Sequence, residues 1–241
     1  MKIGLVTDSL SAEPFEDMLD QAASVGVEQV EFATGGWSES PHIDIDSLLA
    51  DANARDRFLG AVTERGMTIS ALNANGNQLH PVIGKQVDQV VRKTVELASL
   101  LKVSTVVLMS GLPGGGPQDL NPNWVTTSWP PETQTILNYQ WNEVALPYWR
   151  DLAALGRSKG VQFAVEMHGT QLVYNAETLL RLREAVGDVV GANLDPSHPM
   201  WMGADPRMVA RALSGAIHNV HAKDSRFQPH IVAVNGVLGT Q

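Results

Sequence analysis

The stretch VQFAVEMHG, residues 161–169, ends a short apolar run in a glutamate and a histidine. Successive side chains of a strand point to opposite faces. The large apolar side chains of this stretch would therefore share one face, and Glu166 and His168 would share the other. A buried strand that ends in two ionisable groups decides the fold only if similar strands recur along the chain.

Such strands do recur, and stretches with helical periodicity separate them. Regular strand–helix alternation predicts a parallel sheet. The number and spacing of the units favour a (β/α)8 barrel over an open doubly wound sheet, and no GxGxxG motif follows the first strand. The expected strands are 2–8, 27–35, 67–77, 104–111, 161–167, 189–195 and 216–222, and the expected helices are 14–26, about 46–65, 81–101, 138–159, 176–186 and about 205–214.

The eighth unit of such a barrel is incomplete. Only residues 226–241 follow the seventh strand, and barrels of this kind have roughly 250 residues or more. The segment HIVAV, residues 230–234, could form a strand, but no helix follows it. We therefore expect one domain over residues 1–241, an α/β fold of the (β/α)8 TIM barrel type, truncated after the seventh strand and lacking its C-terminal β/α unit.

Composition restricts the class of protein. The chain has 241 residues, 44% of them apolar, and no cysteine, which excludes disulfides, thiolate metal sites and thiol nucleophiles. The net charge is −9 and no run of basic residues stands out, which argues against a nucleic-acid partner. The N-terminus lacks the apolar stretch of a signal peptide, and no segment is long enough to span a bilayer. We expect a cytoplasmic protein with a small-molecule partner and no membrane contact, and a homo-oligomer is compatible with the sequence.

The segment 112–134 is rich in Gly, Pro and Asn and carries Trp124 and Trp129. Long loops in compact domains are usually functional or disordered, and tryptophans need a packing partner. We interpret this segment as a lid or pocket wall over the barrel. The alternative is a loop packed on the outside or used in an oligomer contact.

Barrel enzymes carry their active residues at the C-terminal ends of the strands. Strand alternation aims Glu166, Asp195 and His221 into the barrel from three consecutive strands. Each has an ordinary explanation: an ion pair or helix cap, a turn before Pro196, or a core histidine. Their coincidence favours a site for a divalent cation, because two carboxylates neutralise the ion and the imidazole adds a directional donor. Such a metal could stabilise the enediolate formed by proton abstraction next to a carbonyl.

The motifs VEMHG, NLDPSHP and VHAKDSR resemble those of the xylose-isomerase-like TIM barrel superfamily, in particular its sugar phosphate isomerase/epimerase branch. The resemblance extends from the first to the seventh strand. It implies a Mn, Mg, Co or Zn ion held by Glu166, Asp195 and His221, with Glu166 also moving a proton. The expected substrate-contacting residues are His198, His168, His80, and Lys223 or Arg226 as the basic group that holds the sugar.

One feature of the superfamily is missing. Its fourth metal ligand and second acid/base is a glutamate on strand eight, and no Glu or Asp follows Asp224 in this chain. Either the chain is a piece of a longer protein, which we favour because the helical part of the unit is missing too, or the site has three ligands and is impaired.

The leading functional hypothesis is a metal-dependent isomerase or epimerase of sugars or sugar derivatives, acting through an enediolate. Some relatives dehydrate or cleave oxidised sugars through the same kind of intermediate. A metal-dependent phosphodiesterase resembling apurinic-site endonucleases is the alternative, but the fourth strand ends in VLMSG without a histidine and the loop that follows is not basic. A non-catalytic sugar-binding remnant is the third hypothesis.

Overall fold

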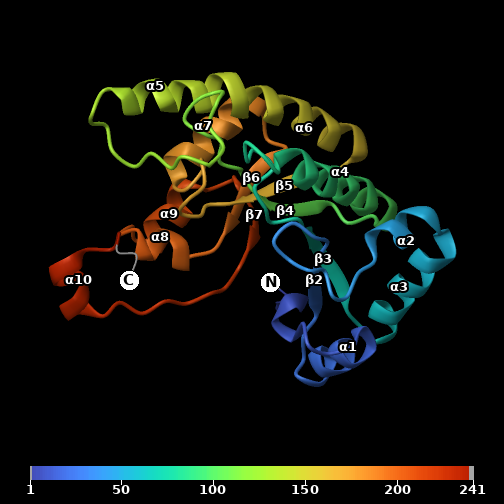
Figure 1. Ribbon diagram of the computed structural model, residues 1–241. Coiled ribbons are helices and arrows are strands. Elements are labelled where there is room, and N and C mark those ends of the chain that lie inside the picture. Colours follow the sequence, from blue (N-terminus) through green and yellow to red (C-terminus); the bar gives the residue numbers. More distant parts are fainter. Residues whose placement is uncertain (1, 239–241) are drawn as a thin grey trace.

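A computed structural model describes residues 2–238 and has a parallel sheet curved into a half-barrel (Figure 1). Within these residues the sheet has seven strands paired in chain order, and β1 and β7 do not pair with each other. The α/β fold and the seven parallel strands of an open barrel are therefore as predicted. The strands are β1 (Gly4–Val6), β2 (Gln29–Ala33), β3 (Thr68–Asn73), β4 (Thr105–Met109), β5 (Gln162–Glu166), β6 (Val190–Leu194) and β7 (Ile217–Val220).

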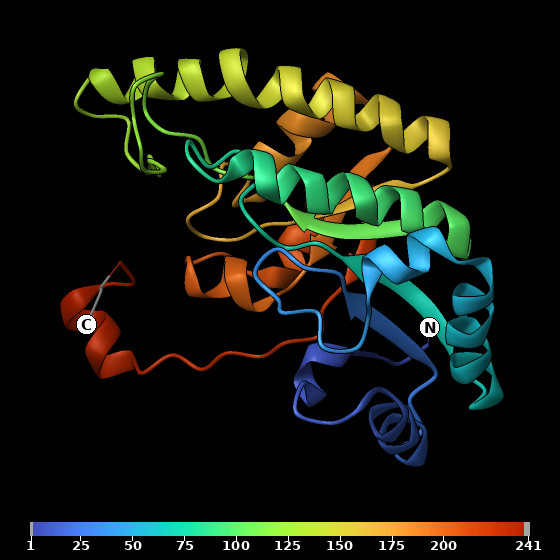
Figure 2. The ribbon, with the colours of Figure 1, turned by 45° about the vertical axis from the view of Figure 1, so that its right-hand side comes forward.

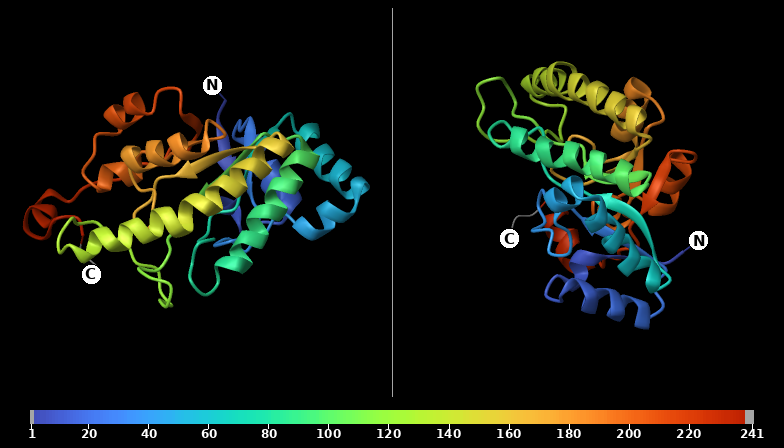
Figure 3. Two further views of the ribbon diagram at one scale, coloured as in Figure 1. Left: turned by 90° about the horizontal axis from the view of Figure 1, so that it is seen from above. Right: turned by 90° about the vertical axis from the view of Figure 1, so that its right-hand side faces the viewer.

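Helices cover the outer face of the sheet (Figures 1 and 3). The predicted helix over 46–65 is two helices, because Asp51 leaves the helical conformation and its side chain accepts a hydrogen bond from the backbone N–H of Asn53. No helix within residues 2–238 combines the length and the apolar character needed to cross a membrane. The helices are η1 (Thr7–Leu10), α1 (Phe15–Ser24), α2 (Ile45–Ala50), α3 (Ala52–Glu64), α4 (Gly84–Leu101), α5 (Glu132–Asn138), the π-helical η2 (Tyr139–Ala145), α6 (Leu146–Lys159), α7 (Ala176–Val186), α8 (Ser197–Trp201), α9 (Pro206–Ala212) and α10 (Pro229–Asn235).

The core confirms the predicted alternation of side chains in the strands. Phe163 and Val165 of β5 belong to the large apolar cluster between the sheet and the helices. Ala164, on the other face, packs with Ala71 and Val107 in a small separate cluster inside the barrel. Glu166, two residues after Ala164, shares this inner face.

The expectation of a strand at 230–234 is wrong, because these residues belong to α10. Pro229 occupies the first turn, where its fixed φ favours a helix start. The segment before α10 runs away from β7, and α10 lies apart from the sheet (Figures 1 and 2). No α10 side chain is buried, and Val234 is 82% exposed. In the part of the chain that the structure describes, the facing edges of β1 and β7 therefore stay open.

Candidate metal centre

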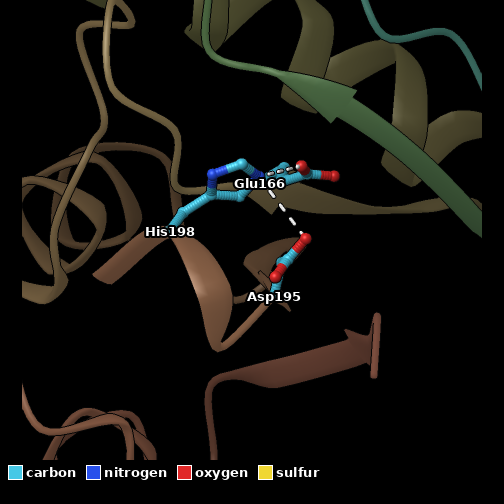
Figure 4. A group of neighbouring side chains, drawn as sticks. All are labelled: Glu166, Asp195 and His198. Carbon is cyan, nitrogen blue, oxygen red and sulfur yellow. Dashed lines mark ion pairs between the residues drawn. The ribbon is translucent and has the colours of Figure 1, made fainter. Parts of the chain in front are cut away.

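Three buried side chains converge at the C-terminal end of the sheet: Glu166 at the end of β5, Asp195 after β6, and His198 in α8 (Figure 4). His198 Nε2 lies 3.2 Å from Glu166 Oε1 and 3.4 Å from Asp195 Oδ2. One ligand atom of each residue lies within 4.8 Å of the others. A divalent ion with bonds of about 2.0–2.6 Å could reach all three.

Each carboxylate of this group is anchored through one oxygen. Asp195 Oδ1 accepts hydrogen bonds from the backbone N–H (2.9 Å) and the hydroxyl (2.6 Å) of Ser197. Glu166 Oε2 accepts from the side-chain amides of Asn193 (2.9 Å) and Asn75 (3.4 Å). Asp195 Oδ2 and Glu166 Oε1 both face His198 Nε2, and such oxygen donors fit a hard divalent cation.

His221, which follows β7, lies between two carboxylates. Its Nδ1 is 3.3 Å from Glu166 Oε2, and its Nε2 is 3.0 Å from Glu31 Oε1. Burial opposes the charged imidazole, but hydrogen bonds to Glu166 and Glu31 outweigh burial and raise the pKa of His221 to about 10. Burial likewise opposes ionisation of Glu166, but hydrogen bonds from His198 and His221 hold its pKa well below the ordinary value. Glu166 is therefore ionised, as a metal ligand must be.

The hydrogen bonds of His198 define which ring nitrogen carries its proton. The indole Nε1 of Trp201 lies 3.3 Å from His198 Nδ1. An indole N–H can only donate, so Nδ1 accepts and the proton of the neutral ring is on Nε2, which faces the two carboxylates. Direct metal binding by Nε2 would require loss of the Trp201 hydrogen bond, whereas a donor at Nε2 could bind a substrate oxygen.

Replacing Trp201 with phenylalanine should remove this control over the His198 ring. A hydrogen bond of about 1 kcal/mol corresponds to about a fivefold change in the ratio of the two tautomers. NMR of isotope-labelled histidine nitrogens should show the Nε2–H form of His198 losing population. The same substitution at the exposed Trp129 should leave the ratio unchanged. An unchanged ratio in the Trp201→Phe variant would show that another group orients the ring.

Two more predicted residues lie at this centre. Lys223 Nζ is 3.4 Å from both Asp195 Oδ2 and His198 Nε2. The ring centroids of His168 and His198 are 4.1 Å apart. Both residues therefore lie beside the group formed by Glu166, Asp195 and His198.

Two others are not brought into contact with it. The His80 ring accepts hydrogen bonds at Nδ1 from the backbone N–H groups of Val82 and Ile83, in the turn just before α4. Arg226 is exposed, in the segment between β7 and α10. Within residues 2–238 neither side chain forms a hydrogen bond or ion pair with Glu166, Asp195 or His198.

Sequence reasoning assigned no role to Glu31, Asn75 and Asn193, which contact Glu166 or His221. A signal for Asn193 was present, because it lies two residues before Asp195 and so shares its face of the strand. The Asn75 amide donates to Glu166, and its Oδ1 is buried without a hydrogen-bond partner in the described part of the chain. It can accept a hydrogen bond from a bound ligand.

The long loop contributes one tryptophan to the mouth. Trp124 makes an edge contact with Tyr174, with ring centroids 5.7 Å apart. A Cβ added to Gly169, which directly follows His168, would collide with the Trp201 ring at 2.5 Å and touch Trp124 at 3.4 Å. Trp124 thus lies over the end of β5, where the lid interpretation expects it, whereas Trp129 is 75% exposed.

The half-barrel and its ring of carboxylates and imidazoles define a barrel protein with a candidate metal centre at the C-terminal mouth. Residues 19–235 match the family described as Xylose isomerase-like TIM barrel, and the chain belongs to this family. It is 53% identical over 245 residues to YfiH of Bacillus subtilis (strain 168), an uncharacterized protein, and the alignment covers 100% of this chain and 78% of YfiH.

Solved structures share the fold at low sequence identity. The probable 3-DHS dehydratase AsbF of Bacillus anthracis superposes with a TM-score of 0.68 at 18% identity, over 98% of this chain and 77% of that one. A D-psicose 3-epimerase superposes with a TM-score of 0.64 at 12% identity, over 100% of this chain and 82% of that one. These similarities establish the fold alone.

Proposed function

We propose that the protein is a divalent-metal-dependent isomerase or epimerase of sugars or sugar derivatives, which removes a proton from the carbon next to a carbonyl. The observation that carries the proposal is the convergence of the buried side chains of Glu166 and Asp195 with two imidazoles at the barrel mouth. The epimerases and the dehydratase among the structural neighbours support it, because such reactions can begin with the same proton abstraction.

We assign the metal to Glu166, Asp195 and His221, the ligand set that the family resemblance implies. His198 is the imidazole within reach of both carboxylates, and its Trp201 hydrogen bond favours a donor role at Nε2 in place of metal binding. A bound Mn, Mg, Co or Zn ion would polarise the substrate carbonyl and offset the negative charge that develops on its oxygen.

The chain's own residues perform the proton transfer. A Glu166 oxygen takes the proton on the carbon next to the carbonyl, and the electrons of that C–H bond form the carbon–carbon double bond of an enediolate. His198 donates from Nε2 to a substrate oxygen, and Asn75 Oδ1 accepts from a hydroxyl. Trp124 and Trp201, over the end of β5, limit the access of water to the intermediate.

The reaction should be visible as exchange of a substrate proton with solvent, which needs one base and not two. We expect the full chain, loaded with Mn²⁺ or Mg²⁺ and given ketoses in deuterium oxide, to incorporate deuterium next to the carbonyl, and a chelator to stop it. Proton NMR and mass spectrometry would measure the incorporation.

The other functions give different results in the same assay. Loss of water from the substrate would indicate a dehydratase, whereas cleavage of abasic DNA without exchange on any ketose would support the phosphodiesterase. Metal binding without any turnover would support the non-catalytic remnant. Each of these results would contradict the proposed isomerase.

A further inference from the structure

Glu31 is a buried carboxylate for which the proposed reaction has no use. It lies on β2 and is 4% exposed. Oε1 accepts from the side-chain amide of Asn73 (2.7 Å) and Oε2 from that of Asn219 (3.0 Å), while both oxygens lie 3.0 Å from His221 Nε2. Because β2 and β7 are not neighbours in the sheet, these contacts cross the barrel interior.

These contacts exclude Glu31 as a substitute for the missing second acid/base. A catalytic base needs a lone pair directed at the substrate. Three donors surround the two Glu31 oxygens, and the His221 ring lies between Glu31 and Glu166. Glu31 can therefore act only through the groups that it contacts, and above all through His221.

The two nitrogens of His221 face different chemistry. Nε2 faces Glu31, and an ionised carboxylate only accepts, so Nε2 keeps a proton. Nδ1 is 2.9 Å from the Asn193 amide nitrogen and faces Glu166. The Asn219 side-chain amide donates to Asn193 Oδ1 at 3.2 Å. This contact turns the amide nitrogen of Asn193 toward Glu166 and His221, and it donates to Glu166. In this structure Nδ1 therefore donates to Glu166 Oε2, and a metal ion bound by Glu166 would take the place of that Nδ1 proton.

We propose that Glu31 is a positioning residue that holds a His221 proton on Nε2 and thereby leaves Nδ1 as the ring nitrogen that a divalent metal ion at Glu166 and Asp195 would bind. The proposal rests on the metal centre of the proposed function and not on its reaction. Histidine ligands of metals commonly donate their second N–H to a carboxylate, which fixes the tautomer and increases ligand basicity.

A closed hydrogen-bonded ring supports this assignment. Glu31 accepts from Asn219, Asn219 donates to Asn193, Asn193 donates to Glu166, and His221 bridges Glu166 and Glu31. Every member sits on or next to an inner strand end, so the orientation of His221 does not depend on a mobile surface group. A polar network in which every member is paired fixes one arrangement of side chains.

The test uses the full chain with labelled histidine nitrogens and Zn²⁺ as a diamagnetic probe. In the wild type, we expect His221 to keep its Nε2–H while zinc shifts Nδ1. A His221→Gln variant identifies the signals. In Glu31→Gln, the glutamine amide can donate to Nε2, so the Nδ1–H tautomer should become populated. Zinc affinity, measured by calorimetry, should fall by about 10–100-fold.

Glu28→Gln is the matched control, because it makes the same substitution just before β2, where Glu28 is exposed and accepts from the backbone N–H of Ile3. It should leave zinc affinity and the His221 signals unchanged.

Three results would overturn the proposal: zinc bound through Nε2, a wild type that does not bind zinc, or a folded Glu31→Gln with unchanged affinity and tautomer. If Glu31→Gln does not fold, the wild-type spectrum alone still decides which nitrogen binds. Normal zinc binding through Nδ1 without exchange on any ketose would overturn the proposed reaction and leave the role of Glu31 standing.

Discussion

Replacing Glu166 with glutamine should reduce deuterium exchange into the substrate by about 10²–10⁴-fold, the usual contribution of a general base. Glutamine has nearly the same size but cannot take the proton, and it also removes a negative ligand from the metal. The loss should appear in kcat, because the group that moves the proton acts in the transition state.

The control for this variant is Glu184→Gln on the exposed side of α7, which should keep wild-type exchange. Circular dichroism would verify that Glu166→Gln folds, because Glu166 also accepts hydrogen bonds from Asn193 and Asn75. A folded Glu166→Gln with more than half of the wild-type exchange rate would show that another group is the base.

Strand alternation was sufficient to predict much of this site. The interior position of Ala164 and the convergence of Glu166 and Asp195 both follow from the period of two along a strand. The order of the sheet follows from the regular alternation of strands and helices. These features are local, and a single sequence contains them.

Contacts that depend on local irregularity could not be predicted in this way. A register shift between Ala192 and Asn193 interrupts the alternation of β7 against β6. His218 lies against Gly191, where an added Cβ would meet its ring at 2.6 Å. The His218 ring donates a hydrogen bond from Nδ1 to the backbone carbonyl of Phe163, as is typical of a core histidine.

Contacts between distant parts of the chain could not be predicted from the sequence either. Glu31 and His221 are 190 positions apart, and their contact depends on how strongly the sheet curves. His80 is predicted to contact the substrate, and in the structure its Nδ1 accepts from two backbone N–H groups in the turn before α4. Residue type and strand position alone do not show which partners such a histidine has.

Replacing Trp149 with alanine should lower the free energy of unfolding by about 3–5 kcal/mol, the usual cost of removing a buried aromatic side chain. Trp149 on α6 is 1% exposed and meets the Phe163 ring edge-on at 6.0 Å. Its indole donates to the Ser110 carbonyl just after β4 (3.0 Å). The loss is a large part of the 5–15 kcal/mol that typically stabilises a domain.

Two further variants separate packing from hydrogen bonding in this prediction. Trp149→Phe keeps an aromatic ring against Phe163 but leaves the Ser110 carbonyl without its donor, so it should cost less, about 1–3 kcal/mol. Trp129→Ala, at an exposed position, should stay within about 0.5 kcal/mol of the wild type. Urea unfolding followed by circular dichroism would measure all three. A Trp149→Ala loss no larger than that of Trp129→Ala would show that the contact between α6 and the sheet does not stabilise the half-barrel. We expect the loss in the free energy of unfolding to decrease in the order Trp149→Ala, Trp149→Phe, Trp129→Ala. An open sheet must obtain its stability from the helix-covered face, because its largest buried side chains lie there.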